Sequence, residues 1–98
     1  MTVLVREQSV YRIAPAIAVE DFGARSLAFH CREFRLVELN AVARDLLSRL
    51  DGQCTLHQVA AAMADDYAQP FGVILADVQD VVQQMVETGL IERVIPSQ

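Results

Sequence analysis

Two histidines and two cysteines are the residues of this chain best suited to metal binding or nucleophilic chemistry. They form two pairs, His30-Cys31 and Cys54-x-x-His57, and the second pair has the local spacing of some zinc ligands. His30 and Cys31 are neighbours on an expected strand, so their side chains point to opposite faces. Nothing in the sequence places an activated thiolate beside an oriented base. We therefore expect no metal site, no cofactor and no cysteine catalysis, and we expect both thiols to be free, as in a reducing compartment.

Paired carboxylates are the second candidate for chemistry, either as an acid and a base or as ligands of Mg²⁺. Asp65 and Asp66 are adjacent, and Asp77 and Asp80 share one face of an expected helix. That face is the polar side of an amphipathic helix, and Asp77 lies in its first turns, where the helix dipole favours an anion. A solvated face accounts for these residues better than catalysis does. We therefore expect a protein that is not an enzyme.

Three short strands are expected in the first half of the chain. The pattern of apolar and polar residues predicts strands over 17–22, 26–31 and 34–39, with Gly23 as a turn residue between the first two. Alternation along the second strand predicts one buried face. The short links between strands favour an antiparallel meander. Residues 1–11 are expected to form a loosely attached N-terminal segment.

Three helices are expected in the second half, and residues typical of helix ends mark each of them. Asn40 is a good N-cap for the first helix, and Thr55 with Gln58 forms a capping box for the second. Pro70 separates the second helix from the third. Gly89 suits the left-handed position that ends the third helix. The order of elements predicts an α+β domain with a three-stranded antiparallel sheet followed by three helices.

The third helix has a wide apolar arc, roughly 140° against roughly 100° for an ordinary surface helix. Much of this arc must be core, but in a small domain one flank of it is left to line a surface groove. One flank carries Ile74, Val81 and Met85, and the other carries Leu75, Val82 and Val86. The pattern leaves both flanks open, and we favour the second.

Composition limits the possible functions. A chain of 98 residues is long enough for one domain, here 1–98, and a hydrophobic content of 53% indicates a folded protein. The net charge is −5, and all eight cations are arginines. An acidic chain without a basic cluster is a poor ligand for nucleic acid or for an anionic membrane. The sequence shows neither a signal peptide nor an apolar run of membrane-spanning length, so we expect a cytoplasmic protein.

A series of apolar and turn residues follows a fixed order along the second half of the chain. Its members are Leu39-Asn40, Leu46-Leu47, Asp51-Gly52, Thr55, Val59-Ala60, Tyr67, Asp77-Val78 and Gly89-Leu90. This order resembles the family of coenzyme PQQ synthesis protein D, and the resemblance covers roughly residues 16–92. One departure is the link Cys31–Phe34, which lacks the turn glycine common in such proteins.

The resemblance implies both an architecture and a function. It implies a winged-helix-like arrangement of the sheet and the three helices. It also implies a peptide-recognition element of the kind that serves ribosomally made, post-translationally modified peptides such as the precursor of PQQ. Such an element holds the leader part of a precursor peptide and presents it to a modifying enzyme, often of the radical S-adenosylmethionine type.

We expect a leader peptide to add as a further strand to the third strand of the sheet, near Arg35 to Glu38, beside the favoured flank of the third helix. The expected peptide contacts are Arg35, Leu36, Val37, Glu38, Leu75, Val78, Gln79, Val82, Gln83 and Val86. A free sheet edge also invites self-pairing, so a homodimer is a second expected state.

Three helices after a short sheet also suit a winged-helix regulator that binds DNA, or a generic protein-interaction module. Charge separates these alternatives. Residues 72–89 contain no Arg or Lys but contain Asp77, Asp80 and Glu87. The DNA phosphates would repel such a helix, so we favour the peptide-binding function.

Overall fold

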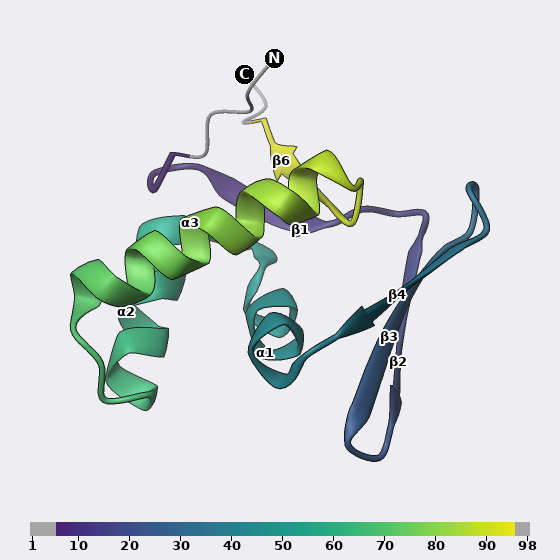
Figure 1. The fold of residues 1–98 in the computed structure, drawn as a ribbon. Coiled ribbons are helices and arrows are strands. Elements are labelled where there is room, and N and C mark those ends of the chain that lie inside the picture. The colour runs from purple at the N-terminus through teal and green to yellow at the C-terminus, as the bar shows by residue number, and fades with distance from the viewer. Residues whose placement is uncertain (1–5, 96–98) are drawn as a thin grey trace.

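A computed structural model describes residues 6–95, which form six strands and three helices (Figure 1). The strands are β1 (Val10–Ile13), β2 (Ile17–Phe22), β3 (Arg25–His30), β4 (Arg35–Leu39), β5 (Asp51–Thr55) and β6 (Ile91–Val94). The helices are α1 (Ala41–Arg49), α2 (Leu56–Asp66) and α3 (Phe71–Glu87). The predicted α+β class is confirmed, and the three predicted strands and three predicted helices appear in the predicted order.

The predicted meander is the antiparallel sheet β2-β3-β4. In this sheet, Val19 of β2 lies opposite Ala28 of β3, and Ala28 lies opposite Val37 of β4. Ala28 is fully buried, so the buried face is the one that carries these three residues. The opposite face exposes Phe22 and Leu36, each by about three fifths of its surface. The small side chain of Ala28 thus packs against the helices, while the larger side chains before and after it on β3 point to the outer face.

A second antiparallel sheet, of order β5-β1-β6, was not predicted. Its central strand β1 pairs with β6, so residues near the two ends of the chain meet, as in Tyr11 opposite Arg93. Tyr11 is 2% exposed. The expectation of a loosely attached N-terminal segment is therefore wrong for the residues described here, whereas 1–5 lie outside the described residues. The carbonyl groups of Ser9 and Glu7 also accept hydrogen bonds from Leu56 and His57 at the start of α2, at 2.9 and 2.7 Å.

The predicted helix ends are confirmed. The side chain of Asn40 accepts a hydrogen bond from the Ala43 amide at 2.8 Å, and Thr55 and Gln58 form the reciprocal capping box. At the end of α3, Gly89 has a φ of +78°, which glycine adopts without the steric penalty of a side chain. The Leu90 amide then donates to the Met85 carbonyl at 2.9 Å, which completes a Schellman motif.

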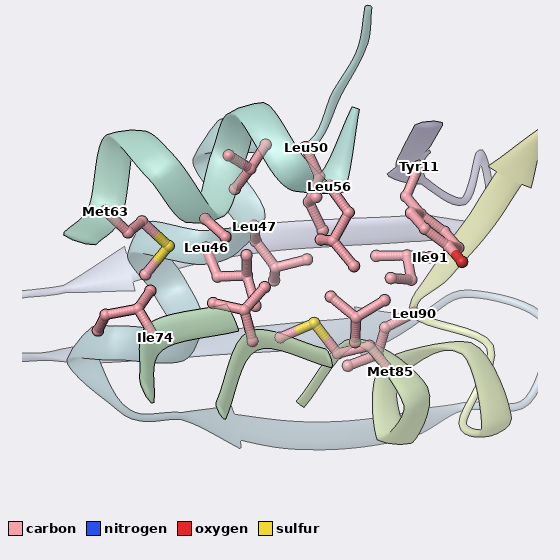
Figure 2. Close-up of a cluster of buried hydrophobic side chains, with 14 of the residues drawn as sticks. Tyr11, Leu46, Leu47, Leu50, Leu56, Met63, Ile74, Met85, Leu90 and Ile91 are labelled. Atoms are coloured by element: carbon pink, nitrogen blue, oxygen red, sulfur yellow. The ribbon is translucent and has the colours of Figure 1, made fainter. Parts of the chain in front are cut away.

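The core lies between the helices, with α1 and α2 on one side and α3 on the other (Figure 2). The most deeply buried large side chains are Leu46, Leu47, Leu56, Met63 and Val82. The β2-β3-β4 sheet extends to one side of this helical core (Figure 1). Within residues 6–95, no helix combines the length and the hydrophobicity needed to cross a bilayer.

Candidate functional site

The free edge of β4 is the first component of the candidate site. In the order β2-β3-β4, β4 hydrogen-bonds to β3 on one side and to no described strand on the other. Every second N–H and C=O group of an edge strand points outward without a ladder partner. Those groups can pair with an extended chain that lies alongside. The expectation of a sheet edge at Arg35–Glu38 is therefore confirmed.

A groove runs between β4 and α3. It has a volume of 150 Å³, and we call it the β4–α3 groove. On the side of the sheet, the groove is lined by Val37 and Leu39. On the side of α3 and its cap, it is lined by Val81, Gln84, Met85, Thr88 and Leu90. Because most of these side chains are apolar, the groove suits apolar side chains of a bound chain.

Arg35 bridges one end of this groove. Its guanidinium donates a short hydrogen bond to the Thr88 carbonyl at the C-terminus of α3, and it forms an ion pair with Glu33 at 3.0 Å. A cation at this end of a helix also complements the helix dipole. The contact links β4 to the last turn of α3 at this end of the groove.

The flank of α3 that faces β4 is the one carrying Val81, not the favoured one carrying Val82. Val82 is 0% exposed and packs in the core, so the prediction that it forms a groove wall is wrong. Leu75 and Val86 are half-buried and pack against the same core. The buried stripe of α3 consists of Ile74, Val78, Val82 and Met85, and Val81 lies at its edge on the side of β4.

The other predicted contacts divide between the two faces of the sheet and the two flanks of α3. Val37 lines the groove. Leu36 and Glu38 point to the outer face, because successive strand residues alternate. Gln79 and Gln83 do not line the groove, and Gln83 donates to Glu87 at 3.3 Å.

Four groove residues on α3 and its cap were not among the predicted contacts, and neither were Leu39 and Leu90; the four are Val81, Gln84, Met85 and Thr88. Val81 and Met85 belong to the flank that the sequence left as the alternative. Gln84 and Thr88 follow Val81 on the same helix face, since residues three, four and seven apart are neighbours there. A choice of the other flank would have identified all four.

A second apolar hollow adjoins the groove, and we call it the helix pocket. It has a volume of 140 Å³ and lies between the three helices. Val81 lines both the groove and the helix pocket, so the two lie next to each other along α3. The lining residues are Val42, Leu46, Met63, Tyr67, Ile74, Asp77, Val78 and Val81. Met63 and Ile74 face each other at this end of the core (Figure 2).

Hydrogen bonds fix the aromatic wall of the helix pocket. The Tyr67 hydroxyl donates to Asp45 at 2.6 Å, and this bond to a carboxylate raises the pKa of the phenol. Arg49 contacts Asp45 at 3.0 Å and Asp66 at 2.7 Å. The bond from Arg49 holds the pKa of Asp45 below its usual value. The Tyr67 ring is thereby held at the mouth of the pocket.

The outer face of the sheet carries a wider and shallower hollow of 540 Å³, lined by Phe22, Arg25, Leu27, Leu36 and Glu38. Arg25 and Glu38 form an ion pair at 2.9 Å, which lowers the pKa of the carboxyl group and raises that of the guanidinium. This hollow lies on a sheet face, where the backbone groups are already paired between strands. The β4–α3 groove, by contrast, combines an apolar lining with the unpaired backbone groups of a strand edge.

The histidines and cysteines are dispersed. His57 contacts Glu7 at 2.5 Å and lies against the Phe71 ring, whereas His30 accepts a bond from the Glu33 amide at 3.3 Å. Cys31 is exposed and Cys54 is half-buried, and neither thiol forms a disulfide. Within residues 6–95, no three ligating side chains lie close enough to hold a metal ion.

The sequence matches the model of one protein family. The family is that of coenzyme PQQ synthesis protein D, PqqD, and the match runs over residues 29–91. The matched region is about two thirds of the chain and includes every residue that lines the groove and the helix pocket. The chain therefore belongs to the PqqD family.

Two solved structures share the fold. One is TbiB1 in complex with the TbiA(beta) leader peptide, with a TM-score of 0.76 and 16% identity over 87% of this chain and 99% of that chain. The other is lasso peptide synthetase B1 complexed with its leader peptide, with a TM-score of 0.75 and 21% identity over 84% of this chain and 96% of that chain. A comparison with curated protein sequences gave no match.

Proposed function

We propose that this protein is a non-catalytic peptide-recognition element that binds the leader of a ribosomally made precursor peptide. The leader adds as a strand to the free edge of β4 and directs alternate side chains into the β4–α3 groove. The protein then presents the rest of the precursor to a modifying enzyme. A radical S-adenosylmethionine enzyme is the partner that family membership favours.

The observation that carries this proposal is the position of an apolar groove directly beside an unpaired strand edge. Backbone pairing along β4 supplies affinity with little sequence preference, and the groove supplies the preference. Membership in the PqqD family supports the same function. The two proteins that share the fold were both solved with leader peptides, which adds further support.

Binding of duplex DNA has no support in the site. In a winged helix that reads DNA, a helix enters the major groove and basic residues contact phosphates. The charged residues of α3 are Asp77, Asp80 and Glu87, all of them acidic. A gel shift at low salt, where screening is weakest, should show no retarded complex.

The peptide-binding proposal is tested by selection from a library of random-sequence peptides on the immobilised protein. We expect extended apolar peptides to be enriched. The best binder is then synthesised in versions with a single N-methyl group at each successive amide. Strand addition predicts weakening by about tenfold at every second position, because only alternate amides face β4. No enrichment, or equal binding by all the methylated versions, would overturn the proposal.

A further inference from the structure

The helix pocket lies where a peptide paired with β4 would emerge. Along α3 the groove and the pocket follow one stripe, from Thr88 through Gln84 and Val81 to Asp77. This stripe covers twelve residues, whose eleven steps of 1.5 Å amount to about 16 Å of helix. Five strand residues span about 17 Å, so a peptide paired along the whole of β4 reaches the helix pocket at its end.

The two ends of this path differ. At the Thr88 end, Arg35 bridges from β4 to α3. At the other end, β4 leads through Asn40 into α1, and Val42 of α1 lines the helix pocket at that point. The peptide therefore leaves the strand edge at Val42, directly over the helix pocket.

The mouth of the helix pocket carries one carboxylate that has no cationic partner among residues 6–95. Asp45 and Asp66 share Arg49, but Asp77 forms no ion pair with a described residue. A cation on the ligand is therefore the charge that complements the mouth. The walls are apolar, and 140 Å³ is about five times the volume that one water molecule occupies in the liquid, enough for a single branched or aromatic side chain.

We propose that the helix pocket is a specificity site for one apolar side chain of the leader peptide, and that Asp77 pairs with a neighbouring Lys or Arg of the same peptide. This inference rests on the proposed strand addition and names the class of peptide that the site selects. The peptide carries one set of apolar residues for the β4–α3 groove. It carries a further apolar residue with an adjacent cation where it leaves the strand.

The binding of an apolar side chain in the helix pocket is tested by placing a larger residue at the rim of the pocket, where it would occupy the same space. Val42 on α1 is 47% exposed, and Val73 on α3 is 52% exposed but does not line the pocket. Val42→Phe should weaken the selected peptide by about tenfold to a hundredfold, the range expected for losing burial of one apolar side chain. Val73→Phe is the matched control and should change the dissociation constant by less than about twofold. Thermal melts of both variants report folding.

The charged part is tested by repeating the library selection on Asp77→Lys and Asp80→Lys. Asp80 is an exposed carboxylate three residues from Asp77 and does not line the pocket. Wild type and Asp80→Lys should enrich Lys or Arg beside the last apolar position, whereas Asp77→Lys should enrich Asp or Glu there.

Each outcome of these tests separates the two proposals. If binders emerge with no charge preference that follows Asp77, or if Val42→Phe binds as wild type does, the specificity site is disproved while strand addition stands. If no binder emerges from any selection, strand addition itself fails. An Asp77→Lys protein that melts early is replaced by Asp77→Asn, which should lose the cation preference without gaining an anionic one.

Discussion

Val81 and Val82 are adjacent on α3 and have opposite environments. Val82 is 0% exposed in the core, whereas Val81 is only partly buried and lines both the groove and the helix pocket. A rotation of about 100° between successive helix residues is enough to separate a packing role from a contact role. Substitutions at the two positions should therefore affect different properties of the protein.

Val82→Ala should lower the free energy of unfolding by about 2 kcal/mol, because it removes two buried methyl groups and leaves a cavity. In a domain of this size, that loss corresponds to a melting temperature lower by about 8–16 °C. Val82→Asp should prevent folding, since it buries an unpaired carboxylate. Circular-dichroism melts measure both effects.

The matched control at the residue scale is Val81→Ala. It should melt closer to wild type than Val82→Ala does, because the Val81 side chain is only partly buried, yet it should weaken peptide binding. A Val82→Ala variant that melts like wild type and binds poorly would show that Val82 is the groove residue after all.

At the scale of elements, the sequence predicts the pieces that have local signals. Asn40, Thr55 and Gly89 carry the chemistry of helix ends in their own side chains or backbone freedom, so the three helices were predicted with their caps. The strands β1, β5 and β6 have no such signal. They are four or five residues long, and β1 pairs with β6 across almost the whole chain. Only the assembled tertiary structure brings these strands together.

Only the strand side of the candidate site could be predicted from the sequence, for a related reason. The edge strand follows from the order of elements, and Val37 follows from alternation along it. The flank of α3 depends on how the helix is rotated against the core, and a wide apolar arc allows either rotation. Packing of Val82 in the core decides the rotation and turns Val81 toward β4.

Substitution by alanine at two glycines, one in α3 and one at its C-terminal cap, should shift the melting temperature in opposite directions. Gly89 has a φ of +78°, and an added Cβ would lie 3.6 Å from His30 Nε2, an ordinary contact. The cost of Gly89→Ala is therefore backbone strain of about 1–2 kcal/mol, which lowers the melting temperature. Gly72 lies in the first turn of α3 with open space around it, so Gly72→Ala should raise the melting temperature through helix propensity. Equal melting of the two variants would contradict the observed end of α3.

At the scale of the whole molecule, ion pairs tie the sheet to the helices and make stability depend on pH. Arg44 of α1 donates to Asp21 of β2 at 2.8 Å, and Ser26 donates to the same carboxylate at 2.6 Å. These bonds lower the pKa of Asp21 from 3.8 to about 2, with the bond from Arg44 contributing most. Bonds from Arg49 to Asp45 and from the Cys54 amide to Asp51 lower the pKa of those carboxyls as well.

The sign of the pH effect follows from these lowered pKa values. The folded chain holds fewer protons on these carboxyls than the unfolded chain does at the same acidic pH. The contribution of Asp21 to stability is complete above about pH 4 and disappears as the pH falls through about 2, and the contributions of Asp45 and Asp51 are also lost as their carboxyls become protonated in acid. Melting temperatures should therefore drop steeply over that interval. Asp21→Asn should melt lower at neutral pH and show a shallower drop, and an unchanged acid profile would show that the Asp21–Arg44 pair does not contribute.

The central claim is that a peptide pairs with β4, and amide hydrogen exchange measured by NMR tests it most directly. The sheet supplies its own control, because β2 is its other edge and does not line the β4–α3 groove. When the library-selected peptide is added, alternate amides within Arg35–Leu39 should exchange more slowly, and those within Ile17–Phe22 should be unchanged. Protection confined to β2, or saturating binding with no new protection in β4, would contradict the claim.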